Sequence, residues 1–177
     1  ACGQSGCHDD QTVEWAVDAY TQWYGEARKP HFGSVLAAAR RGDPDAEAGL
    51  HSLFENTLNP VIVRATVLHA LQAYGGDRVD KAMRQALIDE NALIRVTAVD
   101  AVSHATPEGL VERLGPMLFD SARAVRIRSA ARLADVGPEY LSPLQREALD
   151  KELAAYIEST KHSLDFAASG MNLGTLY

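Results

Sequence analysis

Cys2, Cys7 and His8 stand close together at the beginning of this 177-residue chain, which contains no other cysteine. A histidine directly after a cysteine, with a second cysteine upstream, is the arrangement that attaches a c-type haem. The two thiols bind the haem vinyl groups and the imidazole binds the iron. The common motif has two residues between the cysteines, whereas this chain has four, Gly3-Gln4-Ser5-Gly6. The two glycines let the longer loop bulge, so the motif predicts a covalent haem c on Cys2 and Cys7 with His8 as iron ligand.

Two other interpretations of these residues stay open. Cys2, Cys7, His8 and a further histidine could bind Zn²⁺, although adjacent ligands such as Cys7 and His8 fit a tetrahedral ion poorly. The cysteines could instead form a local disulfide, which we expect in protein made without haem maturation. A disulfide between residues 2 and 7 cannot staple a fold of this size, so the role of the cysteines is local.

His31 is the candidate for a second axial iron ligand, which a haem that only transfers electrons needs. It lies between two expected helices, where loop backbone is free to present a side chain. Alternatively, His31 is an ordinary loop residue and the second ligand comes from elsewhere. Trp15 and Trp23 could line a haem face, but their helical spacing favours a place in the core.

No arrangement of nucleophile, base and acid emerges from the sequence, and there is no glycine-rich phosphate loop. The remaining histidines have no partners at ligand spacing. We therefore expect no catalytic activity from this segment.

The composition is that of a folded, acidic protein. Hydrophobic residues make up 46% of the chain, and 17 Lys and Arg against 24 Asp and Glu give a net charge of −7. This charge argues against nucleic-acid binding. No run approaches the roughly 20 apolar residues of a membrane span. The chain lacks an initiator Met and a signal peptide, so we expect a mature or excised segment. The haem motif places the protein in the periplasm or otherwise outside the cytoplasm, because haem attachment requires export.

An Arg that follows an aliphatic residue recurs at positions 64, 95 and 126, a period of 31 residues. The positions three, four and seven after each Arg are small or apolar, which places them on one face of a helix. An amphipathic stretch precedes each of these helices, at 46–55, 78–88 and 109–119. A fixed period of this length indicates stacked supersecondary units. We predict an all-α fold in which residues 44–141 form a right-handed solenoid of helix pairs.

Helix-end signals complete this description. Residues 1–43 hold the cysteine motif and two helices, one capped by Asp9-Asp10 and ended by Gly25, the other spanning 34–41. Asn59-Pro60 and Thr106-Pro107 have the cap-then-Pro pattern of helix starts. Residues 142–177 hold the C-terminal helices, beginning with a Ser142 capping box and a helix to about residue 159.

The repeated Arg residues have two interpretations. Stacked side by side, they could form a cationic ladder that binds an anionic partner. We favour the second interpretation, in which each Arg pairs with an acid of the neighbouring repeat, such as Asp89 or Asp120, or caps a loop carbonyl. Both acids stand six residues before the Arg of their own repeat, Arg95 or Arg126.

Three resemblances follow from these residues. Helix pairs with Val-Arg or Ile-Arg opening the second helix resemble HEAT repeats over about 44–140. The spacing of Leu173-Gly174 to Tyr177 resembles the first helix of a tetratricopeptide repeat, with Gly170 at the usual Trp position. The haem motif followed by Trp23-Tyr24-Gly25, by Pro-His-Phe-Gly at 30–33 and by residues 37–43 resembles bacterial multihaem cytochromes that combine haem motifs with both repeat types.

The last resemblance implies an electron-transfer module at the C-terminal part of an exported multihaem c-type cytochrome. It implies further haem motifs upstream of Ala1 and a chain that continues beyond Tyr177. The partners would be other haem domains or proteins that contact the helical repeats. The alternative function is a protein-interaction scaffold without haem, in which Cys2 and Cys7 form a disulfide or bind a metal.

Overall fold

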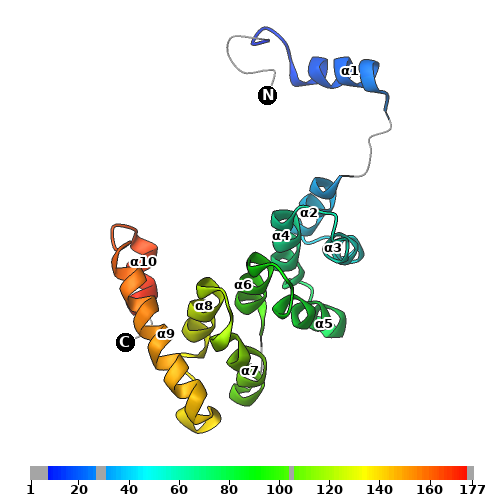
Figure 1. Ribbon diagram of the computed structural model, residues 1–177. Helices are drawn as coiled ribbons and strands as arrows, with labels where there is room; N and C mark the ends of the chain where they lie inside the picture. Colours follow the sequence, from blue (N-terminus) through cyan, green and yellow to red (C-terminus); the bar gives the residue numbers. More distant parts are fainter. Residues whose placement is uncertain (1–7, 27–30, 104–105, 175–177) are drawn as a thin grey trace. The chain divides into compact units, whose positions relative to one another are not determined.

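The computed structural model describes residues 8–26, 31–103 and 106–174, and within them the fold is entirely helical, with no β-strand. This confirms the all-α prediction (Figure 1). The chain divides into two compact units, residues 1–34 and 35–177.

The first helix, α1 (Val13–Tyr24), begins after Thr12 and not at Asp9-Asp10 as predicted. Thr12 has an extended backbone, and its hydroxyl accepts a hydrogen bond from the Trp15 N–H at 3.2 Å, which makes it the N-cap. Gly25 ends the helix at a φ of 79°, as predicted. None of the residues of α1 is buried.

The second helix, α2 (Phe32–Arg40), begins two residues earlier than the predicted start at 34. The reason is a local hydrogen bond: the imidazole Nδ1 of His31 accepts the Gly33 N–H at 3.0 Å. A side chain that satisfies an amide of the first turn lets the helix begin directly after it.

The described residues of 46–103 and 106–174 form eight further α-helices and two short 3₁₀ helices. They are α3 (Ala46–Glu55), α4 (Val61–Leu71), α5 (Gly76–Leu87), α6 (Ala92–Ala101), α7 (Pro107–Leu114), η1 (Gly115–Phe119), α8 (Arg123–Leu133), η2 (Pro138–Tyr140), α9 (Pro143–Lys161) and α10 (Ala167–Gly174). The stretch predicted at 109–119 is thus an α-helix up to Leu114 that continues as the 3₁₀ helix η1. The reason is Pro116, which has no N–H to continue the α-helical bonding.

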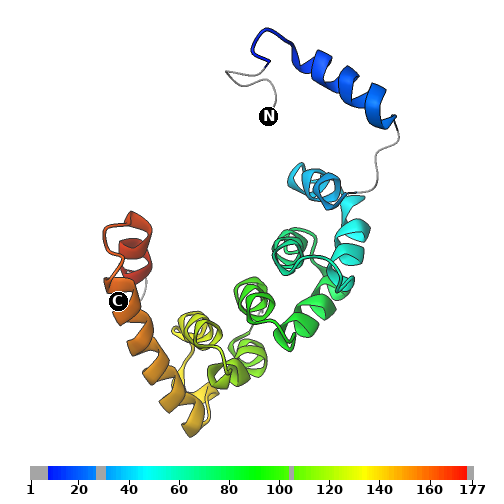
Figure 2. The ribbon, with the colours of Figure 1, turned by 45° about the horizontal axis from the view of Figure 1, so that its top comes forward.

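The helices that carry the repeated Arg residues, α4, α6 and α8, pack side by side. Helix α3 packs on α4, α5 on α6, and α7 with η1 on α8, while α9 covers the far side of α8 (Figure 2). The face predicted to be buried is buried: all nine positions are at most 1% exposed. These residues are Val67, Leu68, Leu71, Ala98, Val99, Val102, Ser129, Ala130 and Leu133.

Of the three polar caps predicted for residues 44–177, two are confirmed. The Thr106 hydroxyl accepts the Gly109 N–H at the start of α7, and Ser142 forms a capping box with Gln145 at the start of α9. Asn59 does not cap α4. Its amide donates instead to the Leu53 carbonyl at 2.8 Å, which ties the loop back to α3.

Candidate functional site

His8 is the first residue that the structure describes, and the predicted haem anchors Cys2 and Cys7 lie outside the described residues. The exposed imidazole of His8 contacts the Trp15 ring, with 4.8 Å between the ring centroids and 47° between the planes. The His8 carbonyl accepts the Gln11 N–H at 3.2 Å, in a turn that leads directly into α1. The imidazole of His8 is thus exposed beside an aromatic ring, and its predicted role as an iron ligand stays a prediction.

The two tryptophans differ from the expectation that they belong to a core. Trp15 is 39% exposed and Trp23 is 72% exposed. Helix α1 therefore presents aromatic side chains on its surface instead of burying them.

His31 acts as the N-cap of α2 in this structure. Its ring lies against Phe32, with centroids 4.0 Å apart, and its Nδ1 accepts the Gly33 amide proton. A neutral imidazole that accepts at Nδ1 carries its proton on Nε2. Binding iron through Nε2 would therefore require the proton to move to Nδ1 and the Gly33 N–H to be released, at a cost of about 1 kcal/mol. The structure thus shows a local role for His31 that the sequence pattern did not reveal.

No group of three or more His, Cys, Asp and Glu residues is arranged to hold a metal ion within the described ranges 8–26, 31–103 and 106–174. In the part of the chain that the structure describes, no helix is long and apolar enough to cross a membrane.

Arg64 and Arg95 pair with acids of the following repeat, and Arg126 pairs with an acid of α9, which confirms the favoured interpretation of paired Arg residues. Arg95 makes the best-formed pair: its Nε lies 2.7 Å from one Asp120 oxygen and its Nη2 lies 2.8 Å from the other. The remaining guanidinium nitrogen donates to the Asp89 and Glu90 carbonyls at 2.8 and 2.9 Å. The side chains of Arg95 and Asp120 are only 12% and 7% exposed.

The other two pairs, at neighbouring steps, each have one hydrogen bond between guanidinium and carboxylate. Arg64 contacts an Asp89 carboxylate oxygen at 2.8 Å and donates to the Phe54 carbonyl at 3.0 Å. Arg126 donates to Glu152 of α9 at 2.9 Å. These pairs connect α4 to the loop after α5, α6 to the loop after η1, and α8 to α9. The guanidinium groups therefore join neighbouring helices and do not form a ladder for an anionic partner.

Glu152 is the acid that the sequence period could not identify. The position 31 residues after Asp120 is Lys151, so the repeat pattern stops there. The continuous helix α9 supplies Glu152 one residue later. At the N-terminal end of the series, the position 31 residues before Asp89 is Leu58, which is uncharged and 91% exposed. The series of ion pairs therefore begins with Arg64.

The hydrogen bonds from Arg95 hold the pKa of the Asp120 carboxyl below its ordinary value. Burial opposes this shift, and the Ala122 N–H adds to it. The same contact raises the pKa of Arg95. Both groups therefore stay charged, as a paired and hydrogen-bonded set within the helical stack.

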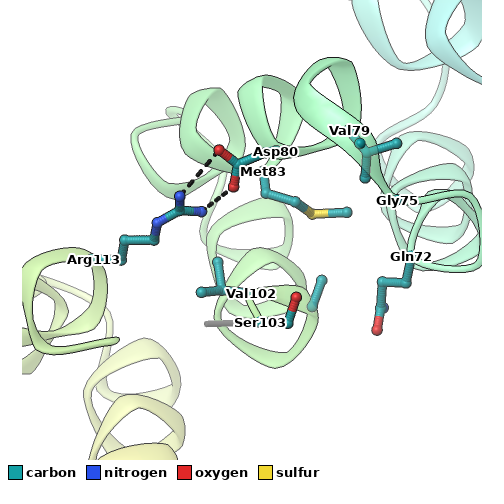
Figure 3. A pocket seen from close by; sticks show the side chains of 10 residues that line it. Gln72, Gly75, Val79, Asp80, Met83, Val102, Ser103 and Arg113 are labelled. Carbon is teal, nitrogen blue, oxygen red and sulfur yellow. Dashed lines mark hydrogen bonds and ion pairs between the residues drawn. The ribbon is translucent and has the colours of Figure 1, made fainter. Parts of the chain in front are cut away.

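A cavity of about 210 Å³ lies between α5, the end of α6 and α7 (Figure 3). Arg113 forms a two-point ion pair with Asp80 at its wall, and Met83 and Val102 supply apolar lining. Arg84 also contacts Asp80, at 3.0 Å. Asp80 and Arg113, the two charged residues that line this cavity, are thus paired with each other.

His51 on α3 is a buried titratable group. It is 1% exposed, and its Nε2 has no hydrogen-bond partner among the described residues, although Glu47 Oε1 lies 3.5 Å away. Burial lowers the pKa of His51 most strongly, and the charge of Arg78 lowers it further, against the opposing effect of Glu47 and Glu55. His51 is therefore held neutral inside the fold.

We expect the protein to lose stability as the pH falls below about 6.5, the ordinary pKa of histidine. The unfolded chain takes up the proton on His51 first, so the free energy of unfolding is highest above this pH and declines toward the lower folded-state pKa. Urea unfolding between pH 8 and pH 5 measures the effect. In His51→Leu the decline should be smaller, whereas the exposed His69→Leu should retain it. An identical pH dependence in both variants would contradict this assignment.

Comparison of the chain with protein-family models, curated proteins and solved structures finds no match.

Proposed function

We propose that this chain is an electron-transfer module of an exported multihaem c-type cytochrome, located in the periplasm or otherwise outside the cytoplasm. The observation that carries the proposal is the motif Cys2-Gly3-Gln4-Ser5-Gly6-Cys7-His8, whose histidine is exposed on the turn that leads into α1. Cys2 and Cys7 would anchor a haem c covalently, and His8 would bind the iron.

The haem would supply a one-electron redox couple. The chain's own residues would orient the ligand. The Trp15 ring limits the rotation of the His8 imidazole, and the Gln11 N–H holds the His8 carbonyl in its turn. His31 is the proposed second iron ligand, and this role would require its imidazole to release the Gly33 amide.

The helical part would serve as an interaction and spacing scaffold, a right-handed solenoid of HEAT-like helix pairs over 44–141. Three observations support this proposal: the 31-residue period, the side-by-side packing of α4, α6 and α8, and the Arg–acid pairs between successive steps. Residues 167–177 would begin a tetratricopeptide repeat.

Expression with export and the c-type haem maturation machinery tests the haem proposal. We expect a red protein with a Soret band and a mass increase of one covalently bound haem. Cys7→Ser should abolish the two-point attachment and His8→Ala should change the axial-ligand spectrum, whereas the exposed control His69→Ala should change neither.

Colourless protein of unchanged stability under these conditions would contradict the haem proposal and favour the scaffold function without haem, with a Cys2–Cys7 disulfide or a bound metal. The variant His31→Ala distinguishes iron binding by His31 from its capping of α2. Loss of the low-spin spectrum would identify His31 as an axial ligand. An unchanged spectrum with reduced helicity would assign it to capping α2 alone.

A further inference from the structure

Helix α1 carries an exposed apolar stripe at the spacing of a helix–helix seam. Val13, Val17, Tyr20 and Tyr24 follow one another at intervals of four, three and four residues, the alternation found at the a and d positions of coiled coils. They are 75%, 45%, 45% and 69% exposed. The Tyr20 and Tyr24 rings contact each other, with centroids 4.8 Å apart, so the stripe is continuous at its C-terminal end.

A helix of this length needs a partner. Isolated helices shorter than about 12–15 residues are marginally stable in water, and helices in proteins gain most of their stability from packing an apolar face. Helix α1 has 12 residues and buries none of them. Covering the stripe would therefore stabilise the helix itself.

The charge around the stripe has one sign. Residues 8–26 contain five carboxylates, Asp9, Asp10, Glu14, Asp18 and Glu26, and no Lys or Arg. Glu14 and Asp18 lie on the polar side of α1, next to Val13 and Val17. A second copy of this chain docked through α1 would bring like charges together, which disfavours self-association.

We infer that α1 is the docking surface for a helix of a partner protein that carries an apolar stripe flanked by Lys or Arg. The apolar stripe supplies the contact area, and the carboxylates select for cations and accelerate the encounter. Docking at α1 is separate from the proposed electron transfer and does not require bound haem.

The haem-free, reduced full chain tests the inference, so that its outcome is independent of the haem proposal. The probe is a synthetic helical peptide with Leu at the a and d positions and Lys at the flanking positions, titrated by calorimetry and by Trp fluorescence. We expect one peptide to bind per chain, with an increase in helicity and an affinity that falls as salt rises. A peptide of the same charge with Ser in place of Leu should bind at least tenfold more weakly.

Two double variants on α1 separate the contributions of the apolar stripe and of the carboxylates to peptide binding. Val17→Gln with Tyr24→Gln keeps helix-forming residues but makes the stripe polar, and should weaken binding at least tenfold. Glu14→Gln with Asp18→Asn should weaken binding and reduce its salt dependence. The matched control, Glu147→Gln with Asp150→Asn, removes the same charge from the exposed face of α9 and should bind the peptide like the unmodified chain.

Three results would overturn the inference. Equal weakening by the α9 control would assign binding to net charge alone. Self-association abolished by the Val17 and Tyr24 changes would identify a second copy as the occupant. Binding of α1 to phosphatidylcholine vesicles with no preference between the two peptides would identify a membrane surface.

Discussion

Replacing Arg95 with Ala is expected to lower the free energy of unfolding by about 3–5 kcal/mol, the effect of breaking a buried ion pair from one side. The Asp120 carboxylate, 7% exposed, would lose both of its guanidinium bonds. The Asp89 and Glu90 carbonyls would lose their donor as well. The variant therefore leaves a charge and two acceptors without their partner where helix α6 meets the loop after η1.

Urea unfolding followed by circular dichroism measures this loss at pH 7. The matched control is Arg128→Ala, because Arg128 and Asp100 form a pair whose side chains are 42% and 39% exposed. Exposed pairs contribute about 0–1 kcal/mol, so the control should stay close to the unmodified chain. Similar losses in both variants would show that burial does not determine the strength of the Arg95 pair.

The pH dependence of the same variant gives a second readout. The folded-state pKa of Asp120 lies below its ordinary value of 3.8, so the stability that the pair supplies is present above that pH and is lost as the pH falls through the folded-state pKa. The free energies of unfolding of the unmodified chain and of Arg95→Ala should accordingly become more similar under acid conditions. The double variant Arg95→Ala with Asp120→Ala should lose less than the sum of the single changes.

The second large effect is expected for Ile94→Ala, with a loss of about 2–5 kcal/mol. Ile94 is 0% exposed in the first turn of α6, between α4 and α8 in the helical row. Truncation removes apolar contacts and leaves a cavity that the packed helices can fill only in part.

Ile62→Ala is the matched control, since Ile62 also lies in the first turn of its helix, α4, but is 63% exposed. The same chemical change there should cost less than 1 kcal/mol. Chemical denaturation of both variants measures the difference. Equal losses would contradict the assignment of the buried face.

The repeated positions could be predicted from the sequence because helical periodicity depends on local geometry. Small or apolar residues three, four and seven positions after each Arg must lie on one side of a helix, and all nine such positions are buried. The acids Asp89 and Asp120 were also predictable, because their offset from the next Arg recurs. Glu152 was not, since the stack ends on the continuous helix α9, and no second occurrence marks its position.

In the N-terminal segment, the residue types suggest a chemistry, but the helix starts could not be predicted from them. Its chemistry, the haem motif of Cys2, Cys7 and His8, is a proposal read entirely from residue type and spacing. The start of α1 at Thr12 and the capping of α2 by His31 depend on which side chain reaches a free amide, and several polar residues compete for that role. A sequence pattern cannot decide this competition because the candidates have similar local preferences.

The sequence by itself therefore determined the helical class, the 31-residue period, the buried face and two of the three acids that pair with the repeated Arg residues. These depend on interactions within one helix or on a pattern that recurs along the chain. Only the tertiary structure decided that Arg64, Arg95 and Arg126 join neighbouring helices, that the buried Nε2 of His51 has no hydrogen-bond partner among the described residues, and that no residue of α1 is buried. The physical reason is that burial and pairing depend on which surfaces meet after folding, and residues far apart in the chain supply those surfaces.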